Sequence, residues 1–396
     1  MTTLAQTETA QSNIYIEKAK QLAKQYAIDA IERDQRGGAA YEQVNLLRES
    51  GLLKLLVSAR YGGYEQPWSV ALHVVRELAK SDASLAHLYG FHSINILAAR
   101  WIGTPQQVEF LEKGTADNNW FWGNSVNHTD RRLIGRREGD GYRIHGVKHF
   151  SSGSPGSDRL VVAWRDEGND ALVHAAIATN KAGVTVHDDW DGIGQRQTGS
   201  GTVQFDDVYI SSDELLDSKE NAGKAFATLT PILSKSVLAN VYVGSALGAI
   251  EDAKQYTVSQ TRPFIASGVE KAIDDPWIKR QYGELWIQAA VAESFTDRAM
   301  QVLDQVWHRG ADLTIEERGE AAVIVGAANV HAGNAALEVT SRIFEVMGAR
   351  SATRNLGFDR YWRNVRTHTL HDPVEYKLRS VGDWVLTNTY PSILYS

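Results

Sequence analysis

The sequence of 396 residues contains no cysteine, which excludes disulfide bonds, thiolate nucleophiles and metal sites with cysteine ligands. The segment 1–13 is polar and lacks the apolar core of a signal peptide. No stretch approaches the ~18 consecutive apolar residues that a membrane-spanning helix needs. The sequence therefore predicts a cytoplasmic protein with no membrane partner.

Strong charge and several well-known motifs are also missing. The net charge of −7 does not favour nucleic acid or an anionic membrane as a partner. The chain has neither the Gly-x-Gly-x-x-Gly pattern of a dinucleotide site nor a P-loop. The Gly-x-Ser-x-Gly elbow is absent as well, which makes a hydrolase less favoured.

Apolar spacing divides the chain into three segments, 1–117, 118–213 and 214–396. The first and third have apolar residues at helical intervals, whereas the second holds short β-like runs between Gly and Asp turns. A helical lobe, a β lobe and a helix bundle in this order predict an α+β fold, with ligands in the clefts between lobes. Helices are expected at 41–56, 69–80, 84–101, 226–261, 277–308 and 314–347, and strands near 142–148, 160–164, 175–178 and 202–205.

Local signals suggest where some helices begin and end. Ser84 is a plausible N-cap, and Pro105 suits the first turn of the following helix. Gly348 could end the last long helix, which would leave Arg350 where an arginine can bind a phosphate. A surface arginine near a helix end is an equally good interpretation of Arg350.

The pair His368 and His371 is the first chemical candidate. Two histidines three residues apart could bind a metal, but further ligands are available only from scattered histidines such as His87 and His331. The pair could also be structural, hydrogen-bonded at a helix end. A role in acid–base chemistry or in a polar pocket is the third interpretation, because histidine titrates near neutral pH.

Three further segments could line a pocket. Residues 148–158 form a Gly/Ser-rich loop between two β runs, and Ser152 in it could place a hydroxyl against a flat ligand. Asn124 follows a group of aromatic residues at a lobe junction. His92 lies within a helical run. By themselves, these features fit an ordinary loop, a packed core and a structural histidine equally well or better.

Taken together and in order, eight segments resemble the acyl-CoA dehydrogenase superfamily over nearly the whole chain, and within it the reduced-flavin-dependent monooxygenases of bacterial desulfurisation. That superfamily has an N-terminal helical domain, a middle β domain and a C-terminal four-helix bundle. The segments are Gly90-Phe91-His92, Asn118-Asn119-Trp120 with Gly123-Asn124, Lys148-His149-Phe150 with Ser152-Gly153, Asp188-Asp189-Trp190 with Ile193-Gly194, Arg196-Gln197-Thr198, Arg262-Pro263, Phe358 to Arg366 and Thr367 to Pro373.

Two departures separate the chain from true dehydrogenases. Those enzymes typically carry a Gln-x-x-Gly-Gly-x-Gly segment that receives the adenylate of FAD. The corresponding segment of this chain, 344–350, lacks that glutamine and most of those glycines and has Phe344 and Arg350 instead. Where they carry Glu-Gly with a catalytic glutamate, this chain has Asp372 and Pro373. A shorter carboxylate would have less reach toward a substrate proton.

The resemblance implies FMN as the cofactor, reduced by a separate NAD(P)H:flavin reductase, and a homotetramer. A C4a-hydroperoxide of the flavin would oxygenate an organosulfur substrate such as a thiophene, sulfide or sulfone. It also implies a site, with His92, Asn124, Ser152 and His371 around the C4a–N5 edge and His368 supporting them. Trp190 would wall the ring, and Arg262 and Arg350 would hold the phosphate, with one of them from another subunit.

Three alternatives remain at this stage. The first is an acyl-CoA dehydrogenase with Asp372 as its base. The second is a nitrogen or aromatic-carbon hydroxylase of the same branch, and the third is a non-catalytic helical scaffold. The loop after Asn124 is shorter than in the dibenzothiophene enzymes, and loops near a pocket often set substrate choice.

Overall fold

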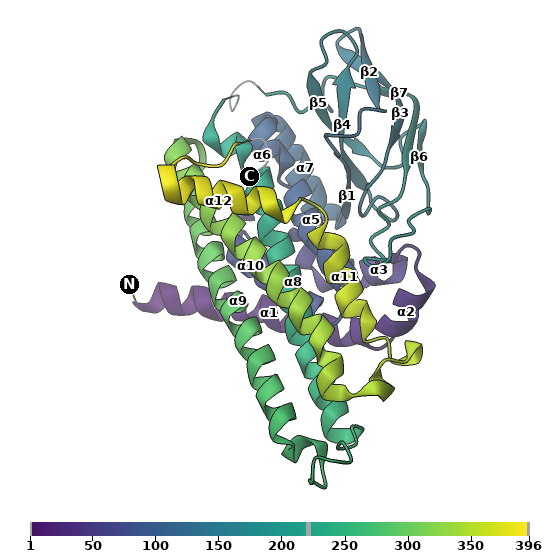
Figure 1. Ribbon diagram of the computed structural model, residues 1–396. Coiled ribbons are helices and arrows are strands. Elements are labelled where there is room, and N and C mark those ends of the chain that lie inside the picture. The colour runs from purple at the N-terminus through teal and green to yellow at the C-terminus, as the bar shows by residue number, and fades with distance from the viewer. Residues whose placement is uncertain (1, 219–222, 394–396) are drawn as a thin grey trace.

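The computed structural model describes residues 2–218 and 223–393, and it has an N-terminal helical lobe, a β lobe and a C-terminal helical lobe (Figure 1). This arrangement confirms the predicted α+β fold. The boundaries at 117/118 and 213/214 stay predictions. The helices of the N-terminal lobe are α1 (Thr2–Ala27), α2 (Ala30–Arg36), α3 (Tyr41–Ser50), α4 (Trp68–Ala79), α5 (Ala83–Asn95), α6 (Ala98–Ile102) and α7 (Pro105–Asn118).

The N-cap of helix α5 lies two residues earlier than the cap signal suggested. The carboxylate of Asp82 accepts hydrogen bonds from the backbone N–H groups of Ser84 and Leu85, so Asp82 is the N-cap and the assignment of Ser84 is wrong. The preceding carboxylate reaches the first-turn amides, which leaves Ser84 inside the helix. The expected helix 84–101 is also interrupted, because α5 ends at Asn95 and α6 begins at Ala98.

The β lobe is one mixed sheet of seven strands in the order β1-β4-β2-β3-β7-β6, with β5 paired to β4. Strand β4 pairs in parallel with β1 and β2, and the remaining pairs are antiparallel. The apolar spacing missed β1, β2 and β6, which are short or polar. The strands are β1 (Trp122–Ser125), β2 (Ile134–Glu138), β3 (Gly141–Lys148), β4 (Arg159–Asp166), β5 (Leu172–Ala178), β6 (Val184–Val186) and β7 (Val203–Ile210).

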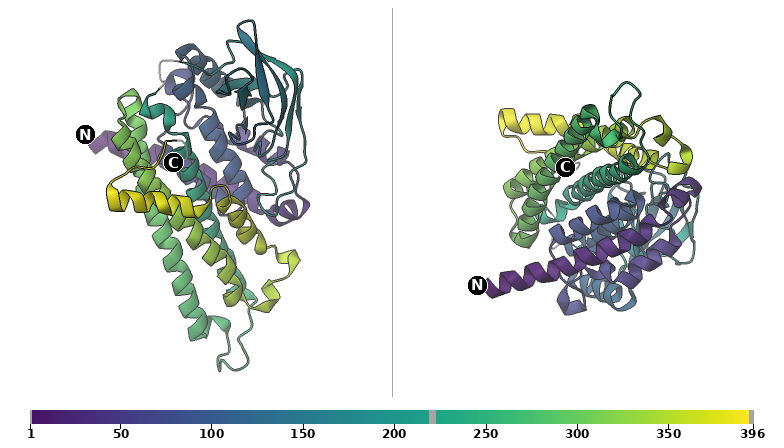
Figure 2. Two further views of the ribbon diagram at one scale, coloured as in Figure 1. Left: turned by 45° about the horizontal axis from the view of Figure 1, so that its top comes forward. Right: turned by 90° about the horizontal axis from the view of Figure 1, so that it is seen from below.

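Three long helices, 230–259, 276–309 and 315–347, form the bundle of the C-terminal lobe, and their bounds agree with the predicted ranges to within a few residues. Two shorter helices complete the lobe. The long helices pack through small side chains such as Ala246, Ala289 and Ala336, which let the helix backbones approach closely. Figure 2 shows α12 crossing the outside of this bundle. The helices are α8 (Thr230–Ser259), α9 (Pro276–Arg309), α10 (Ile315–Met347), α11 (Asp359–Thr369) and α12 (Val374–Thr387).

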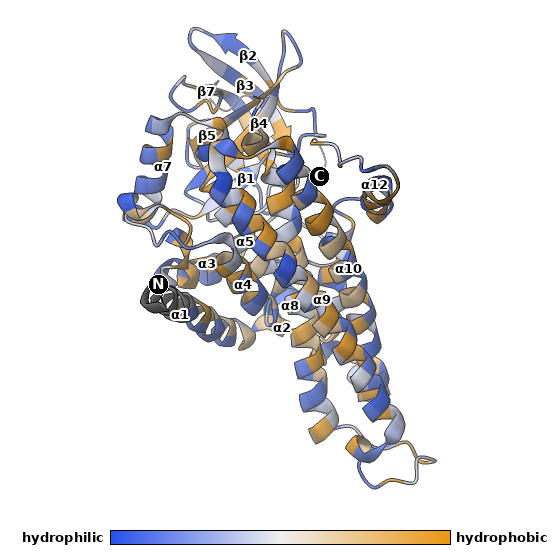
Figure 3. Ribbon diagram, turned by 90° about the vertical axis from the view of Figure 1, so that its left-hand side faces the viewer, coloured by the Kyte–Doolittle hydropathy of each residue, from blue (hydrophilic) through white to orange (hydrophobic). Residues whose placement is uncertain are grey.

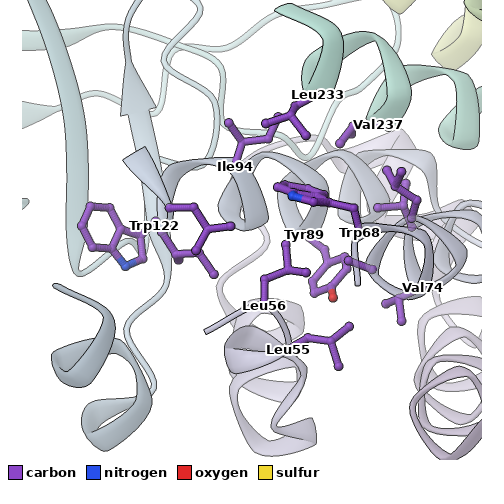
Figure 4. Close-up of a cluster of buried hydrophobic side chains, with 14 of the residues drawn as sticks. Leu55, Leu56, Trp68, Val74, Tyr89, Ile94, Trp122, Leu233 and Val237 are labelled. Atoms are coloured by element: carbon purple, nitrogen blue, oxygen red, sulfur yellow. The ribbon is translucent and has the colours of Figure 1, made fainter. Parts of the chain in front are cut away.

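Helix α8 is long and apolar enough to cross a membrane by length and composition, but 89% of its apolar window is buried inside the protein. Burial of this kind is typical of the central helix of a bundle. Figure 4 shows how the core joins the lobes: Trp122 of β1 lies in one cluster with Tyr89 of α5 and Leu233 and Val237 of α8. The helical and β lobes therefore share one apolar core at their junction.

Helix α9 carries large apolar side chains on an exposed face. Trp286 is 62% exposed, and Trp277, Ile287 and Val291 are each at least half exposed. Figure 3 shows α9 along the bundle, with its hydrophobic positions in orange. Exposed apolar surface on this scale is typical of a contact with another protein surface.

Candidate functional site

Asn124 and Ser152 lie together at the edge of the β lobe. The backbone N–H of Asn124 donates to the carbonyl of Ser152 over 3.1 Å. Gly123 permits this approach, because a Cβ there would lie 2.8 Å from the backbone of Gly153. The side-chain amide of Asn124 has no hydrogen-bond partner within residues 2–218 and 223–393, so it is available to a ligand.

A pocket of about 340 Å³ opens beside these residues. Trp190 and Phe150 form its aromatic part, with ring centroids 5.8 Å apart at 67°. Phe150 is 61% exposed, so an aromatic face is offered to solvent next to the polar edge. The hydroxyl of Ser200 lines the pocket and lies 2.7 Å from the hydroxyl of Ser152. The other lining residues are Asn127, Thr129, Asp130, Arg132 and His149.

The loop that carries Trp190 is fixed against α11. The backbone N–H of Gln195 donates to the side chain of Asn364 over 2.6 Å, and the indole N–H of Trp190 donates to the carbonyl of Gln195 over 2.8 Å. Gly194 packs so closely that a Cβ would lie 2.1 Å from the carbonyl oxygen of Arg363. The β lobe and α11 therefore meet at this pocket.

A cluster of histidines lies on the helical side. His87 of α5 stacks on His368 of α11, with ring centroids 4.6 Å apart, and its other face stacks on Phe91 at 4.3 Å. Both rings are buried. Burial, together with the charge of His371, lowers the pKa of His87 to about 3. Burial and the neighbouring His87 and His371 also lower the pKa of His368 well below its usual value.

These two histidines are short of hydrogen bonds. Neither ring nitrogen of His87, nor Nδ1 of His368, nor the buried hydroxyl of Tyr242 has a partner in the described part of the chain. Buried polar groups without partners are costly, and a cluster of them indicates a place where water or a ligand supplies the missing bonds. In the sequence, His87 stands out only as one of several scattered histidines.

His371 follows the end of α11, and its backbone N–H donates to the carbonyl of His368. Its Nδ1 lies 3.4 Å from the carboxylate of Asp372. Burial alone would raise the pKa of Asp372, but His371 and the charges of Lys235 and Lys377 outweigh it and hold the pKa at about 2. Asp372 is therefore a weak base that is paired with an imidazole and two cations.

His92 has different surroundings from those expected. Its Nε2 lies 2.8 Å from the carbonyl of Leu53, and its Nδ1 accepts from the backbone N–H of Trp122 over 3.1 Å. The ring is fully buried and stacks on Phe121. No ring nitrogen is left for a ligand, so the expected place of His92 at the flavin edge does not fit this geometry. His92 instead joins α5 to β1.

Helix α5 connects the two halves of the site. It packs against both β1 and α11, and Asn95 near its end donates to the carbonyl of Gly123 over 3.2 Å. Five residues separate His87 from His92, which turns them by about 140° around the helix. This rotation directs His87 toward α11 and His92 toward β1. The spacing was visible in the sequence, but the neighbours on each side were not.

The two predicted phosphate-binding arginines, Arg262 and Arg350, do not lie beside Asn124 and Ser152. Arg350 donates to the carbonyl of Gln260, and Arg262 follows two residues later, so both lie where α8 and α10 end. Both side chains are exposed. In Figure 1 this end of the bundle points away from the β lobe. One chain therefore does not bring these arginines to Asn124 and Ser152.

Metal binding by the histidines finds no support in the geometry. Within the described ranges, no group of three or more His, Asp or Glu side chains is arranged to hold a metal ion. The cluster of His87, His368 and His371 is instead surrounded by aromatic rings and by the lysine charges near Asp372.

Sequence models of all three acyl-CoA dehydrogenase domains match the chain: the N-terminal domain at residues 9–116, the middle domain at 123–208 and the C-terminal domain at 236–376. The order of a helical, a β and a helical lobe is that of this class. The chain belongs to the acyl-CoA dehydrogenase family.

Within that family the chain is similar to several enzymes that are named as monooxygenases. It is 41% identical to a dibenzothiophene monooxygenase of Mycolicibacterium goodii, with 99% of each chain covered. It is 39% identical to the probable FMNH2-dependent monooxygenase SfnC of Pseudomonas putida over 94% of this chain and 95% of that one.

Solved structures agree with this placement. Methanesulfinate monooxygenase MsuC of Pseudomonas fluorescens superposes with a TM-score of 0.94 at 41% identity, covering 96% of this chain and 99% of that one. TdsC of Paenibacillus sp. A11-2, in a complex with FMN and indole, superposes with a TM-score of 0.92 at 37% identity over 96% of this chain and 100% of that one.

Proposed function

We propose that this chain is the oxygenase of a two-component flavin monooxygenase, which uses reduced FMN and O2 to oxygenate an organosulfur compound. A separate cytoplasmic NAD(P)H:flavin reductase would supply the reduced FMN. The observation that carries the proposal is that α5 packs between two sets of polar residues. Asn124 and Ser152 lie on its β-lobe side, and His87, His368 and His371 lie on its helical side.

The residues present fit FMN. Trp190 and Phe150 offer aromatic surface to a flat ring, and Asn124 and Ser152 offer polar groups at its edge. The buried nitrogens of His87 that lack partners also call for a polar ligand or water. TdsC of Paenibacillus sp. A11-2, which is 38% identical to this chain, has been solved with FMN bound.

When bound, reduced FMN supplies the electrons that activate O2. The protein supplies position, hydrogen bonds and a dry environment. His87 and His368 stay neutral at pH 7 because burial lowers their pKa values, so they can act as hydrogen-bond partners without adding charge. His371 would hold a proton beside the reacting sulfur. Asp372, close to its Nδ1, would orient the ring.

The substrate would be a sulfur compound. In a thiophene, sulfide or sulfinate the sulfur lone pair would attack the activated oxygen, whereas a sulfone has no sulfur lone pair and would be oxygenated at the carbon beside the sulfur. Relatives are named for dibenzothiophene and for methanesulfinate, which differ greatly in size and polarity. The pocket here has an aromatic part and a polar part, and the segment with Asn127, Thr129, Asp130 and Arg132 makes much of the polar part. An assay panel should therefore include thiophenes, sulfides, sulfones and short sulfinates.

The test is an oxygen-coupled assay with reduced FMN that measures oxygenated product and released hydrogen peroxide. The wild type should form product with at least one sulfur compound. His371→Ala and His87→Ala should keep most flavin binding but raise the ratio of peroxide to product by about tenfold, which is the change expected when one hydrogen bond worth about 1.4 kcal/mol is lost. Wild-type ratios in both variants would contradict the assigned roles.

The dehydrogenase alternative makes a different prediction. An acyl-CoA dehydrogenase would need Asp372 as a free base, but its pKa of about 2 and its pairing with His371 make it a poor one. Under anaerobic conditions, acyl-CoAs should therefore leave the absorbance of oxidised FMN bound to this protein unchanged. Bleaching of the flavin by an acyl-CoA would contradict the monooxygenase proposal.

We also propose that the site is completed between subunits of a homotetramer. Arg262 and Arg350 lie at the bundle end, away from Ser152 of the same chain, and the exposed apolar face of α9 lies on the same bundle. A second copy packed on that face would bury its tryptophans. Its arginines would then reach the phosphate of FMN held by the first copy.

A further inference from the structure

Three hydroxyl groups form a continuous chain that ends at Ser152. The hydroxyl of Thr198 lies 2.9 Å from the carbonyl oxygen of Gln195 and 2.6 Å from the hydroxyl of Ser200. The hydroxyl of Ser200 in turn lies 2.7 Å from that of Ser152. Thr198 is 1% exposed and Ser200 is 6% exposed, so water does not compete freely for these bonds.

The carbonyl at the start of the chain sets the direction of its hydrogen bonds. The carbonyl oxygen of Gln195 cannot donate, although it also accepts from the backbone N–H of Thr198 over 3.2 Å. The contact of 2.9 Å between it and the Thr198 hydroxyl is therefore a hydrogen bond only if the single hydroxyl proton of Thr198 points to Gln195. Thr198 can then only accept from Ser200, and Ser200 can only accept from Ser152. The reverse order would leave two buried oxygens, of Thr198 and Gln195, 2.9 Å apart with no proton between them.

The same carbonyl also fixes the aromatic wall. The indole N–H of Trp190 donates to the carbonyl of Gln195 over 2.8 Å. The backbone of Gln195 is in turn bound to Asn364 of α11. The start of the hydroxyl chain is therefore anchored to a rigid part of the pocket, and Ser152 at its other end borders the pocket through Ser200.

With its proton committed to Ser200, Ser152 presents only lone pairs to a ligand. A ligand atom that meets it must donate a hydrogen bond. The N5 atom of reduced flavin carries a hydrogen and can donate, whereas N5 of oxidised flavin has a lone pair and cannot. We propose that the chain Gln195–Thr198–Ser200–Ser152 makes the site prefer reduced FMN over oxidised FMN. This inference rests on the proposed function, in which Ser152 contacts the flavin ring.

Such a preference suits an enzyme that exchanges its flavin in every cycle. The protein must capture reduced FMN that a separate reductase releases, and it must let oxidised FMN go after the reaction. An acceptor at Ser152 favours the first event. It also weakens binding of the oxidised product, because two lone pairs would face each other.

The test is an anaerobic titration that measures the Kd of reduced and oxidised FMN for the wild type, Thr198→Val and Thr198→Ser. The wild type should bind reduced FMN more tightly. Thr198→Val keeps the shape but removes the first hydroxyl, so Ser200 and Ser152 can reverse and Ser152 can donate to oxidised N5. The ratio of the Kd of oxidised FMN to the Kd of reduced FMN should fall about tenfold, which corresponds to ~1.4 kcal/mol. Thr198→Ser restores the hydroxyl and should keep the wild-type ratio.

Ser200→Ala provides a second test if Thr198→Val does not fold. It also frees the proton of Ser152 and should lower the ratio mainly by tightening oxidised FMN. Ratios within twofold of the wild type in both variants would overturn the inference. So would a wild type that binds both redox forms equally while still oxygenating sulfur substrates. A wild type that binds neither form of FMN would instead refute the proposed function.

Discussion

At the scale of single residues, the two histidines of α5 show how neighbours decide a role. His87 is buried with both ring nitrogens lacking partners in the described chain, and it stacks on His368 of the candidate site. His92 is equally buried but has a partner at each nitrogen. The first is therefore suited to a ligand, and the second holds β1 and Leu53 in place.

The surroundings of His92 predict how stability responds to acid. Burial lowers its pKa to about 4, partly offset by the bond to Leu53. The unfolded chain takes up a proton near pH 6.5 and the native protein does not, so the stabilisation is complete above pH 6.5 and is lost as the pH falls toward 4. The loss is roughly 3 kcal/mol for this one group.

The measurement is the free energy of unfolding in urea at pH 7 and pH 5. His92→Gln does not titrate, so its stability should fall less between these pH values than that of the wild type. It should be less stable at pH 7, because glutamine does not reproduce both hydrogen bonds of the ring. An equal acid response in the two proteins would show that His92 is not the responsible group.

At the scale of elements, the start of α5 determines whether His87 is presented correctly. Asp82 caps the helix and also pairs with Arg33, a side chain that is 1% exposed, over 2.8 Å. Arg33 donates in addition to the side chain of Gln197, next to Thr198. A single carboxylate therefore links the first turn of α5 to the loop that carries the hydroxyl chain.

Removing this carboxylate should be costly. Asp82→Ala loses the cap and leaves a buried arginine with fewer partners, so we expect a loss of about 3 kcal/mol or more. Asp82→Asn keeps an oxygen for the cap and should lose less. Ser84→Ala is the matched control, because Ser84 is not the cap, and it should change stability by only about 0.5 kcal/mol. Urea unfolding would check the order, and an equal loss in Asp82→Ala and Ser84→Ala would contradict it.

At the scale of the whole molecule, one chain supplies only part of the proposed flavin site. Ser152 and Asn124 lie at the β lobe, whereas Arg262 and Arg350 lie at the far end of the bundle. The exposed face of α9, with Trp277 and Trp286, gives a second chain an apolar surface to pack on. Assembly and cofactor binding are therefore expected to be coupled.

Mixed assemblies can test this coupling. Ser152→Ala and Arg350→Ala should each be strongly impaired alone. If the arginine acts in a neighbouring subunit, an assembly of both variants contains some sites with an intact Ser152 from one chain and an intact Arg350 from the other. Co-expression should then restore a measurable fraction of wild-type activity and FMN binding. No recovery in purified mixed assemblies would contradict the shared site.

A surface substitution gives an independent check of the assembly. Trp286→Glu should weaken the assembly, measured by light scattering, and should lower FMN affinity with it. Ile28→Glu, at a residue that is 85% exposed on the N-terminal lobe, is the control and should change neither. Dissociation without any loss of FMN affinity would separate assembly from the cofactor site.

The sequence by itself determined the class of fold, the long helices and the family, because these depend on local periodicity and on the order of short motifs. It placed α9 and α10 to within a few residues, since apolar spacing near 3.6 persists over some thirty positions. It also brought Asn124, Ser152 and Trp190 forward as candidates.

Only the tertiary structure decided which side chains have unfilled hydrogen bonds and which way those bonds run. His87 and His92 look alike in sequence, and their difference lies in Trp122, Leu53 and His368, which come from other parts of the chain. The short strands β1 and β6 and the cap at Asp82 likewise depend on partners distant in sequence or on exact backbone geometry. Hydrogen bonds between distant segments leave no periodic signal, so only the folded chain reveals them.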